Sequence, residues 1–410
     1  MRLGAARTSE GIRMTSIASP IPAAPAPIRG EAGKGITLIA AQILPVMAVV
    51  SLFPAIPRLF AQFGGHPQAG LLVPMIVTMP SLCVALFAPF AGAIADRFGR
   101  RPSFLLALAV YALAGLAPLV LNDLYLVVAS RGVLGLAEAV IVTNSSALIG
   151  DYFGSQRHRW VSWVGVSISI AGTLLVAAGG ALADISWRGP FAIYVLAIPT
   201  LLLALLYIDE PARRDTDKTA PLGFPWGPAL VIGAVTMATS ILYYVEPLHV
   251  ASALMAKGVG SSTAVGLIQA CTSLAYIAGA FLYRRIHAQP VGVLLGLAGI
   301  LTAIGLAMIG LATHYPLAVA GAAIQQFGSG LVIPALMAWG QAMLPLEQRG
   351  RGMGIWATAF FAGLFVCPPL VGLGQRAVGG LDQALLLFAA ITLVLSLLSA
   401  LFFRTSAARH

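Results

Sequence analysis

Three ionisable side chains stand inside long apolar stretches of the sequence, where each could do chemistry: Arg131, Glu138 and Glu246. A charge at membrane depth costs several kcal/mol unless it is paired or faces water, so by default it marks function. A carboxyl group that loses its water favours the protonated form, which lets it take up a proton near neutral pH. These residues therefore indicate proton or ion handling inside a membrane.

Arg131 and Glu138 are separated by seven positions. On a helix this spacing puts them within about 20° of one face and about 10 Å apart along the axis, too far for a direct pair. We expect Glu138, near the membrane midplane, to carry a proton or to be the counter-ion of a substrate. The alternative is a structural acid that is hydrogen-bonded to a neighbour such as Asn144 or Ser145.

Glu246 falls in the outer third of its apolar stretch, at a depth close to that of Arg131. We expect these two residues to pair across the molecule; the alternative is that Glu246 lies at the wet interface. Pro247 follows Glu246 directly. Because proline has no N–H, it should free a backbone carbonyl and permit a bend in the helix.

Three further polar residues are candidates for a central cavity: Arg58, Gln325 and Gln326. Arg58 lies at the outer end of the first apolar stretch, where it should either snorkel to water or contact a substrate. Gln325 and Gln326 follow Arg131 by about 194 residues, which is the offset between two similar halves of the chain. They should act as uncharged donors in the cavity or as hydrogen bonds between helices.

The sequence offers no residues for other kinds of chemistry. Cys83, Cys271 and Cys367 stand singly, without CxxC spacing or a nearby His cluster, so neither a disulfide framework nor a metal site is expected. No loop carries a nucleophile–base set or a Gly-rich phosphate loop, so we expect no enzyme, no receptor and no bound cofactor. The net charge of +10 reflects membrane topology and not a nucleic-acid partner.

The elements that must position the candidate residues are membrane helices. Of the 410 residues, 59% are hydrophobic and 9% are charged, against roughly 45–50% and about 25% in soluble domains. A bilayer core of about 30 Å needs about 20 apolar residues per helix. Twelve such spans are predicted: 36–61, 70–95, 102–121, 124–151, 160–183, 190–208, 226–254, 262–284, 291–312, 317–345, 353–373 and 381–403.

Basic residues gather in every second connection between these spans. With a cytoplasmic amino terminus, 19 of the 24 Lys and Arg residues fall in cytoplasmic segments. This bias follows the positive-inside rule and predicts that both termini are cytoplasmic. The Pro/Ala-rich segment 1–35 is expected to be a disordered cytoplasmic tail, and 404–410 a short cytoplasmic one.

The twelve spans fall into two sets of six. A charged stretch, 209–225, separates a first half over 36–208 from a second half over 226–403, and is expected to be a cytoplasmic linker. Two similar six-helix halves are the repeat pattern of secondary transporters. The predicted fold class is therefore an all-α integral membrane protein with twelve transmembrane helices in two halves.

A loop motif connects this pattern to a known family. The segment GAIADRFGRR, Gly92 to Arg101, resembles the signature loop between the second and third helices of the major facilitator superfamily. RGVLG, which begins at Arg131, is similar to an element of the family's fourth helix. At Glu138 the family usually has a small side chain, so the carboxylate is a departure. The resemblance covers roughly 36–403 and implies two halves that rock around a central cavity.

The resemblance also implies a cytoplasmic latch between the halves. In such a latch Asp96 faces the positive amino end of the eleventh helix, near Met353, and Arg100 bridges Asp151. The bland alternative is a solvated turn whose arginines only set the topology. The residues that the resemblance assigns to the latch are Gly92, Asp96, Arg97, Gly99, Arg100, Arg101 and Asp151.

Within the family, the chain resembles the drug/proton antiporter-like branch, with one further departure. Proton-driven exporters carry Gly-x-x-x-Gly-Pro-x-x-Gly-Gly in the fifth helix; here Gly179 and Gly180 are present, but Leu175 and Val176 stand where Gly-Pro would be. The resemblance implies a monomeric, multi-pass protein of the cell (inner) membrane that exports a small organic or amphipathic solute with proton coupling. The alternative is proton symport or facilitated uptake of an organic anion bound by Arg131.

Overall fold

The computed structural model describes residues 30–211, 224–345 and 348–402. The expected tail up to residue 29, most of the linker 209–225 and the segment 404–410 lie outside the described residues. Helices account for nearly all of the described chain. They are α1 (Glu31–Val50), η1 (Phe53–Ala55), α2 (Ile56–Phe63), α3 (Ala69–Phe98), α4 (Arg100–Leu116), η2 (Ala117–Leu119), α5 (Leu124–Phe153), η3 (Gly154–Gln156), α6 (Arg157–Ile185), η4 (Gly189–Leu196), α7 (Ala197–Tyr207), α8 (Trp226–Ala256), α9 (Ser262–Ile286), α10 (Val291–Leu311), α11 (Tyr315–Ala342), α12 (Arg349–Val378) and α13 (Leu381–Phe402).

Within the described residues, twelve segments are long and apolar enough to cross a membrane. The first, Glu31–Phe63, joins α1, η1 and α2, and the sixth, Gly189–Tyr207, joins η4 and α7. The predicted all-α fold with twelve membrane spans is therefore confirmed.

The first helix starts at Glu31, before the expected residue 36. Gly30 precedes it with a φ of 79°, a left-handed conformation that favours glycine. The charge of Lys34 is accommodated inside the helix because its ammonium pairs with Asp209 at 2.8 Å.

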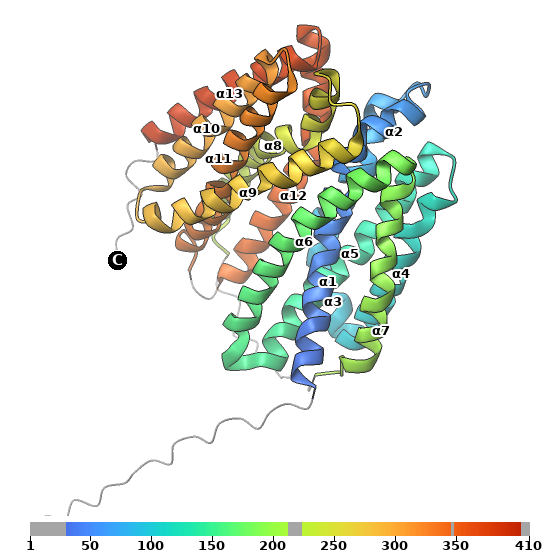
Figure 1. Cartoon of the computed structure of the whole chain (residues 1–410). Helices are drawn as coiled ribbons and strands as arrows, with labels where there is room; N and C mark the ends of the chain where they lie inside the picture. The colour runs from blue at the N-terminus through green and yellow to red at the C-terminus, as the bar shows by residue number, and fades with distance from the viewer. Residues whose placement is uncertain (1–29, 212–223, 346–347, 403–410) are drawn as a thin grey trace, which may run out of the picture.

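The helices form two groups, with α1 to α7 in one and α8 to α13 in the other (Figure 1). We call these groups the first and the second half. The helix ends that carry Arg100, Arg157, Arg285 and Arg349 are called the arginine-rich side, and the other helix ends are called the opposite side.

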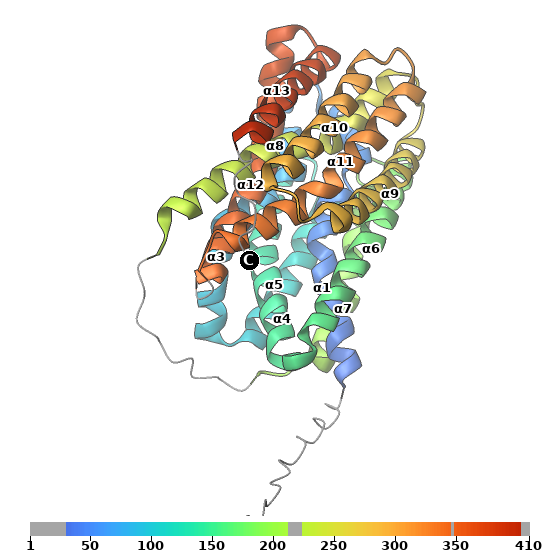
Figure 2. The ribbon, with the colours of Figure 1, turned by 90° about the vertical axis from the view of Figure 1, so that its left-hand side faces the viewer.

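Two helix pairs form the seam between the halves: α6 packs against α9, and α3 lies beside α12 (Figure 2). Gly180 of α6 and Gly266 of α9 bring the first pair to backbone contact, because a Cβ on Gly180 would lie only 2.4 Å from Ser262 O. At the second pair, Thr358 Oγ1 donates to Ala85 O at 3.1 Å. From their contact α6 and α9 diverge toward the arginine-rich side (Figure 1).

Candidate functional site

Arg131 lies on α5 in the interior of the first half, and its side chain is fully buried. Its Nε donates to Ile76 O of α3 at 3.1 Å. That carbonyl would normally accept from the N–H four residues later, but that residue is Pro80, which has none. The guanidinium therefore satisfies a carbonyl that a proline has freed at membrane depth.

A second nitrogen of the Arg131 guanidinium forms hydrogen bonds with α1 and η4. Arg131 Nη2 donates to Ala48 O at 3.4 Å and to the Tyr194 hydroxyl, and that hydroxyl donates to Ala48 O at 3.1 Å. The cation lies 4.7 Å from the ring centroid of Tyr194 and 5.7 Å from that of Phe191. Because α1 ends at Val50, Ala48 O is one of its last carbonyls and needs a partner from outside the helix. Arg131 thus holds four elements of one half together. The expectation of a residue that lines an open cavity is therefore wrong for Arg131 in this form.

Glu138 follows on the same helix and is 1% exposed. It makes no hydrogen bond within the described chain, and its Oε2 is buried without a partner. The neighbours suggested for a structural acid are engaged elsewhere: Asn144 Nδ2 donates to Ser103 Oγ at 2.9 Å, and Ser145 Oγ donates to Ile141 O at 2.6 Å. The structural-acid alternative therefore finds no hydrogen-bond partner.

Arg131 carries a matching unpaired atom, because its Nη1 is also buried without a partner. No ion pair joins Arg131 and Glu138 in the described chain, in agreement with their spacing, although the two charges interact electrostatically. Buried polar groups without partners are rare in proteins, and each needs an explanation. Ser81 Oγ and Asn144 Oδ1 in the described part of the first half are also buried without partners, but Arg131 and Glu138 bear opposite charges and share one helix.

Glu246 of α8 is also 1% exposed, so it does not lie at the wet interface. Its Oε2 accepts from Gln326 Nε2 of α11 at 2.8 Å. The expected pair between Glu246 and Arg131 is not formed. The reason is that Arg131 satisfies backbone carbonyls of its own half, while Glu246 has a neutral partner in the second half.

Pro247 frees a carbonyl, as predicted. The oxygen concerned is Tyr243 O, four residues earlier, and Gln325 Nε2 donates to it at 3.2 Å. Gln325 Nε2 also donates to Ser329 Oγ at 3.0 Å, and the side chain of Gln325 is fully buried. Of the two roles expected for Gln325, it therefore has that of a hydrogen bond between helices.

Asp184, at the end of α6 on the opposite side, joins the two halves. Its carboxylate accepts from the backbone N–H groups of Ser262 and Thr263, both at 2.8 Å, and from Thr263 Oγ1 at 2.7 Å. These N–H groups begin α9, where the helix dipole favours an anion. Arg58 Nη2 lies 3.0 Å from Asp184 Oδ1. Arg58 therefore has an acid partner, which neither the snorkelling nor the substrate-contact interpretation foresaw.

On the arginine-rich side, Arg100 forms an ion pair with Asp151, as the family resemblance implied. The carboxylate of Glu210 accepts from Arg100 N at 2.7 Å and from Arg101 N at 2.8 Å, which caps the start of α4. The sequence alone does not predict this cap, because Glu210 belongs to the charged stretch 209–225. Gly99, between α3 and α4, has a φ of 93°, which explains a glycine there.

The other residues assigned to the latch take different positions. Arg101 Nη2 donates to Leu205 O at 3.3 Å, and the guanidinium of Arg97 lies over the ring of Phe98. A Cβ on Gly92 would meet its nearest neighbour at 3.9 Å, so the packing around this position does not require a glycine. Asp96 is exposed at the end of α3, and its contact with the amino end of α12 stays a prediction.

Comparisons with known proteins agree with this architecture. The Major Facilitator Superfamily model matches residues 38–249 and 228–410. The class B tetracycline resistance protein of Escherichia coli is 27% identical over 180 residues, which are 43% of this chain and 44% of that protein. The multidrug transporter protein MdtP of Bacillus subtilis is 22% identical over 197 residues, or 46% of this chain and 34% of that protein. The chain thus spans less than half the length of these curated relatives.

Two solved structures share the fold. The inward open form of the xylose transporter XylE from E. coli has a TM-score of 0.68 and 15% identity, covering 91% of this chain and 96% of that one. An inward-facing, occupied bacterial homologue of the human lysosomal transporter Spinster has a TM-score of 0.70 and 16% identity, covering 93% and 97%. At these identities the likeness shows the fold alone. This chain is a multi-pass membrane protein, in bacteria of the inner membrane, and it belongs to the Major Facilitator Superfamily.

Proposed function

We propose that this protein is a secondary active transporter that exports a small organic or amphipathic solute in exchange for protons, by alternating access of two six-helix halves, 36–208 and 226–403. The observation that carries the proposal is Glu138, a buried acid with an unpartnered oxygen on the same helix as the buried Arg131. The named relatives, a tetracycline resistance protein and a multidrug transporter, support export of an organic solute.

We place the arginine-rich side in the cytoplasm together with both termini, because positive loops are retained there. The Asp184 contacts then close the outer side, and the divergence of α6 and α9 makes this the inward-facing form. Of the latch residues, Asp96 would act when this side closes, whereas the Arg100–Asp151 pair is already formed within the first half. Both gates form within one chain, which supports a monomer as the working unit.

Proton coupling follows from a change in hydration around Glu138. In the inward-facing form the carboxyl group is sealed from water, and such surroundings favour its uncharged form. A movement of the halves that admits water to α5 favours the carboxylate, with the charge of Arg131 nearby. A proton can drive the cycle only through a difference in its affinity for the two states, and this change in hydration supplies it.

The alternative, uptake of an organic anion, needs a free arginine. Arg131 is held by backbone carbonyls and by Tyr194, and Arg58 pairs with Asp184. Arg131 Nη1 has no partner within the described chain, but the side chain is fully buried, so a carboxylate substrate does not reach it in this form, and export is the better supported function.

The test compares two buried acids in proteoliposomes. A counterflow screen that starts with tetracycline, and continues through other drugs, sugars and organic acids, first identifies a transported probe. Glu138→Gln mimics the protonated acid, so it should abolish transport driven by a pH gradient and leave exchange of the labelled probe largely intact. Glu246→Gln is the matched control, because that acid already has an amide partner, and it should keep gradient-driven transport.

The other outcomes are equally informative. Full gradient-driven transport by Glu138→Gln, together with its loss in Glu246→Gln, would move the coupling role to Glu246. If Glu138→Gln loses exchange as well, Glu138 is the counter-ion of a cationic solute. A probe that accumulates inside cells when a proton gradient is present would overturn export.

A further inference from the structure

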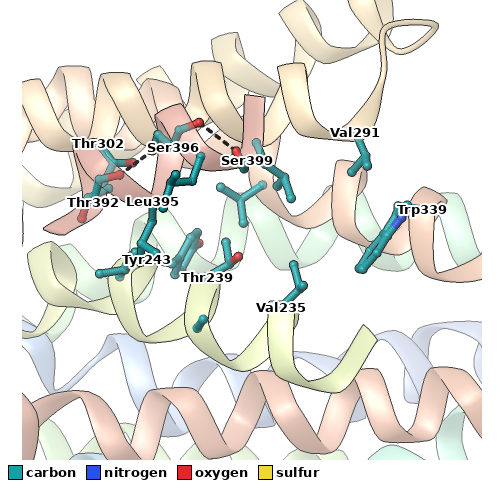
Figure 3. Close-up of a pocket in the computed structure, with 16 residues that line it drawn as sticks. Val235, Thr239, Tyr243, Val291, Thr302, Trp339, Thr392, Leu395, Ser396 and Ser399 are labelled. Atoms are coloured by element: carbon teal, nitrogen blue, oxygen red, sulfur yellow. Dashed lines mark hydrogen bonds between the residues drawn. The ribbon is translucent and has the colours of Figure 1, made fainter. Parts of the chain in front are cut away.

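The second half contains a cavity of about 450 Å3 between α8, α10, α11 and α13. Figure 3 shows Val235, Thr239 and Tyr243 of α8 on one wall, facing Leu395 and Ser396 of α13 on the other. Its volume falls in the range of about 300–1,000 Å3 that is usual for sites that bind small organic molecules. It lies within one half, away from the seam where the two halves meet.

The lining of the cavity is apolar, with hydroxyl groups and without any charged side chain. Some of these hydroxyls are satisfied within the protein: Ser396 Oγ donates to Thr392 O at 2.6 Å. The hydroxyls of Thr239, Tyr243 and Thr302 make no hydrogen bond within the described part of the chain. These three groups can therefore offer hydrogen bonds to a guest, which must itself be uncharged because a charge would find no counter-ion there.

The cavity opens toward the lipid. Two of its lining residues on α13, Leu395 and Leu398, are 44% and 42% exposed on the outer surface of the helix bundle. Along α10 the lining runs from Val291 to Thr302, a length of about 16 Å. This is about half of a hydrocarbon core of roughly 30 Å, so the cavity reaches from the arginine-rich side to mid-depth.

The fold does not by itself require this hollow. In the first half, the space between α1, α4, η4 and α5 is filled by Tyr111 and Tyr194, which are both fully buried. Their hydroxyls donate to Leu44 O at 2.6 Å and to Ala48 O at 3.1 Å. The second half has the same order of helices, yet it leaves this region open and the Tyr243 hydroxyl without a partner.

We propose that this cavity is a binding site for an uncharged, mainly apolar organic molecule with one or a few hydrogen-bonding oxygen or nitrogen atoms, which enters from the bilayer. The free hydroxyls argue against a lipid acyl chain as the intended guest, because a hydrocarbon tail would leave all three without partners at mid-depth. The site is independent of proton coupling, since it needs neither Glu138 nor Glu246.

The test is binding of a photoreactive probe to the full chain in lipid nanodiscs. The probe is a benzyl alcohol that carries a trifluoromethyl diazirine, which is uncharged, aromatic and has one hydroxyl. Labelled positions are mapped by mass spectrometry of peptides. Saturable labelling is expected around Val235 to Tyr243 and on the facing part of α13.

Two substitutions on α8 form a matched pair. Val235→Trp fills the cavity and should lower the apparent affinity about tenfold or more, which corresponds to about 1.4 kcal/mol. Val231→Trp makes the same change one turn earlier on the same helix, at a residue that is exposed and does not line the cavity, and should leave labelling unchanged. Thr239→Val keeps the shape but removes one hydroxyl, so a smaller loss is expected.

Size-exclusion chromatography and thermal unfolding check that each variant is folded. If Val235→Trp does not fold, the test rests on Thr239→Val and on Thr302→Val, which are nearly isosteric. Labelling that does not saturate, or that is equal in all variants, would show contact with the lipid-facing surface only and overturn the site. A phospholipid with a diazirine in its acyl chain that labels the same peptides and excludes the benzyl alcohol would also overturn it, in favour of a lipid tail.

Discussion

The two halves of this protein solve the same packing problem with different chemistry. In the first half, Pro80 frees Ile76 O and the charged Arg131 satisfies it. In the second half, Pro247 frees Tyr243 O and the neutral Gln325 satisfies it. Since a neutral amide is sufficient for this task in one half, the full charge of Arg131 in the other half calls for a second purpose.

The positions seven residues after Arg131 and Gln325 also differ in chemistry between the two halves. The repeat offset of about 194 residues that relates Arg131 to Gln325 also relates Glu138 to Val332, and Val332 lines the cavity of the second half. At these positions the first half is filled and carries Arg131 and Glu138, whereas the second half is hollow and lined by uncharged residues; its own buried acid, Glu246, lies outside that lining. This division suggests that proton handling belongs to the first half and that binding of an apolar guest belongs to the second.

The largest expected effect is on the free energy of unfolding, and it distinguishes Arg131 from Gln325, the two residues that satisfy the freed carbonyls. Arg131→Ala removes hydrogen bonds to two backbone carbonyls and to Tyr194, and we expect it to lower the free energy of unfolding by about 3 kcal/mol. Gln325→Ala leaves one freed carbonyl unpaired and should cost about 1 kcal/mol. Thermal and detergent-induced unfolding of the purified variants measure the difference. Equal losses would mean that the charge adds nothing to the fastening.

The sequence was sufficient for the helices, because a run of about 20 apolar residues has few alternatives to crossing a membrane. It also showed that Pro247 would free a carbonyl, but not that Gln325 would satisfy it. The hydrogen-bond partners of Arg131 could not be predicted from the sequence either. Which side chain meets a freed carbonyl depends on which helices are neighbours, and a single sequence does not give that.

Two acids that organise the helix ends were missed for a different reason. Asp184 and Glu210 stand where apolar spans end, and acids are common at such places, so neither was singled out. What distinguishes them is a neighbour from elsewhere in the chain: both accept hydrogen bonds from the first N–H groups of another helix. A sequence-based signal would have been an acid at a span end facing a second span that begins on the same side.

The two halves also contribute different groups to the seam between them. Substitution of these groups is expected to have an effect of intermediate size. The first half supplies both charges, Asp184 and Arg58, while the second supplies N–H groups and the Thr263 hydroxyl. Asp184→Asn keeps the shape but removes the charge, and should shift the ratio of closed to open forms on the opposite side about tenfold, or about 1.4 kcal/mol. Spin labels at Gly65 and Gly260, two exposed positions with free space around them, should report a longer distance.

Asp382→Asn is the control for this change. Asp382 pairs with Lys257 at 2.6 Å on the same side of the molecule, but both residues belong to the second half. Its substitution should leave the distance between Gly65 and Gly260 unchanged. If Asp382→Asn opens the seam as much as Asp184→Asn does, the effect is a general loss of acidic charge and not the loss of a gate.

The smallest expected effect compares two tyrosines that lie inside the two halves. The Tyr194 hydroxyl accepts from Arg131 and donates to Ala48 O, so Tyr194→Phe should lower the free energy of unfolding by about 1 kcal/mol. The Tyr243 hydroxyl faces the cavity and makes no hydrogen bond within the described part of the chain, so Tyr243→Phe should change the free energy of unfolding by less than about 0.5 kcal/mol.

The same substitution should, however, weaken binding of the benzyl alcohol probe, because it removes a donor that the guest can use. Thermal unfolding with and without the probe measures both quantities in one experiment. A loss of stability in Tyr243→Phe without the probe would show that its hydroxyl already has a protein partner, and would remove it from the proposed site.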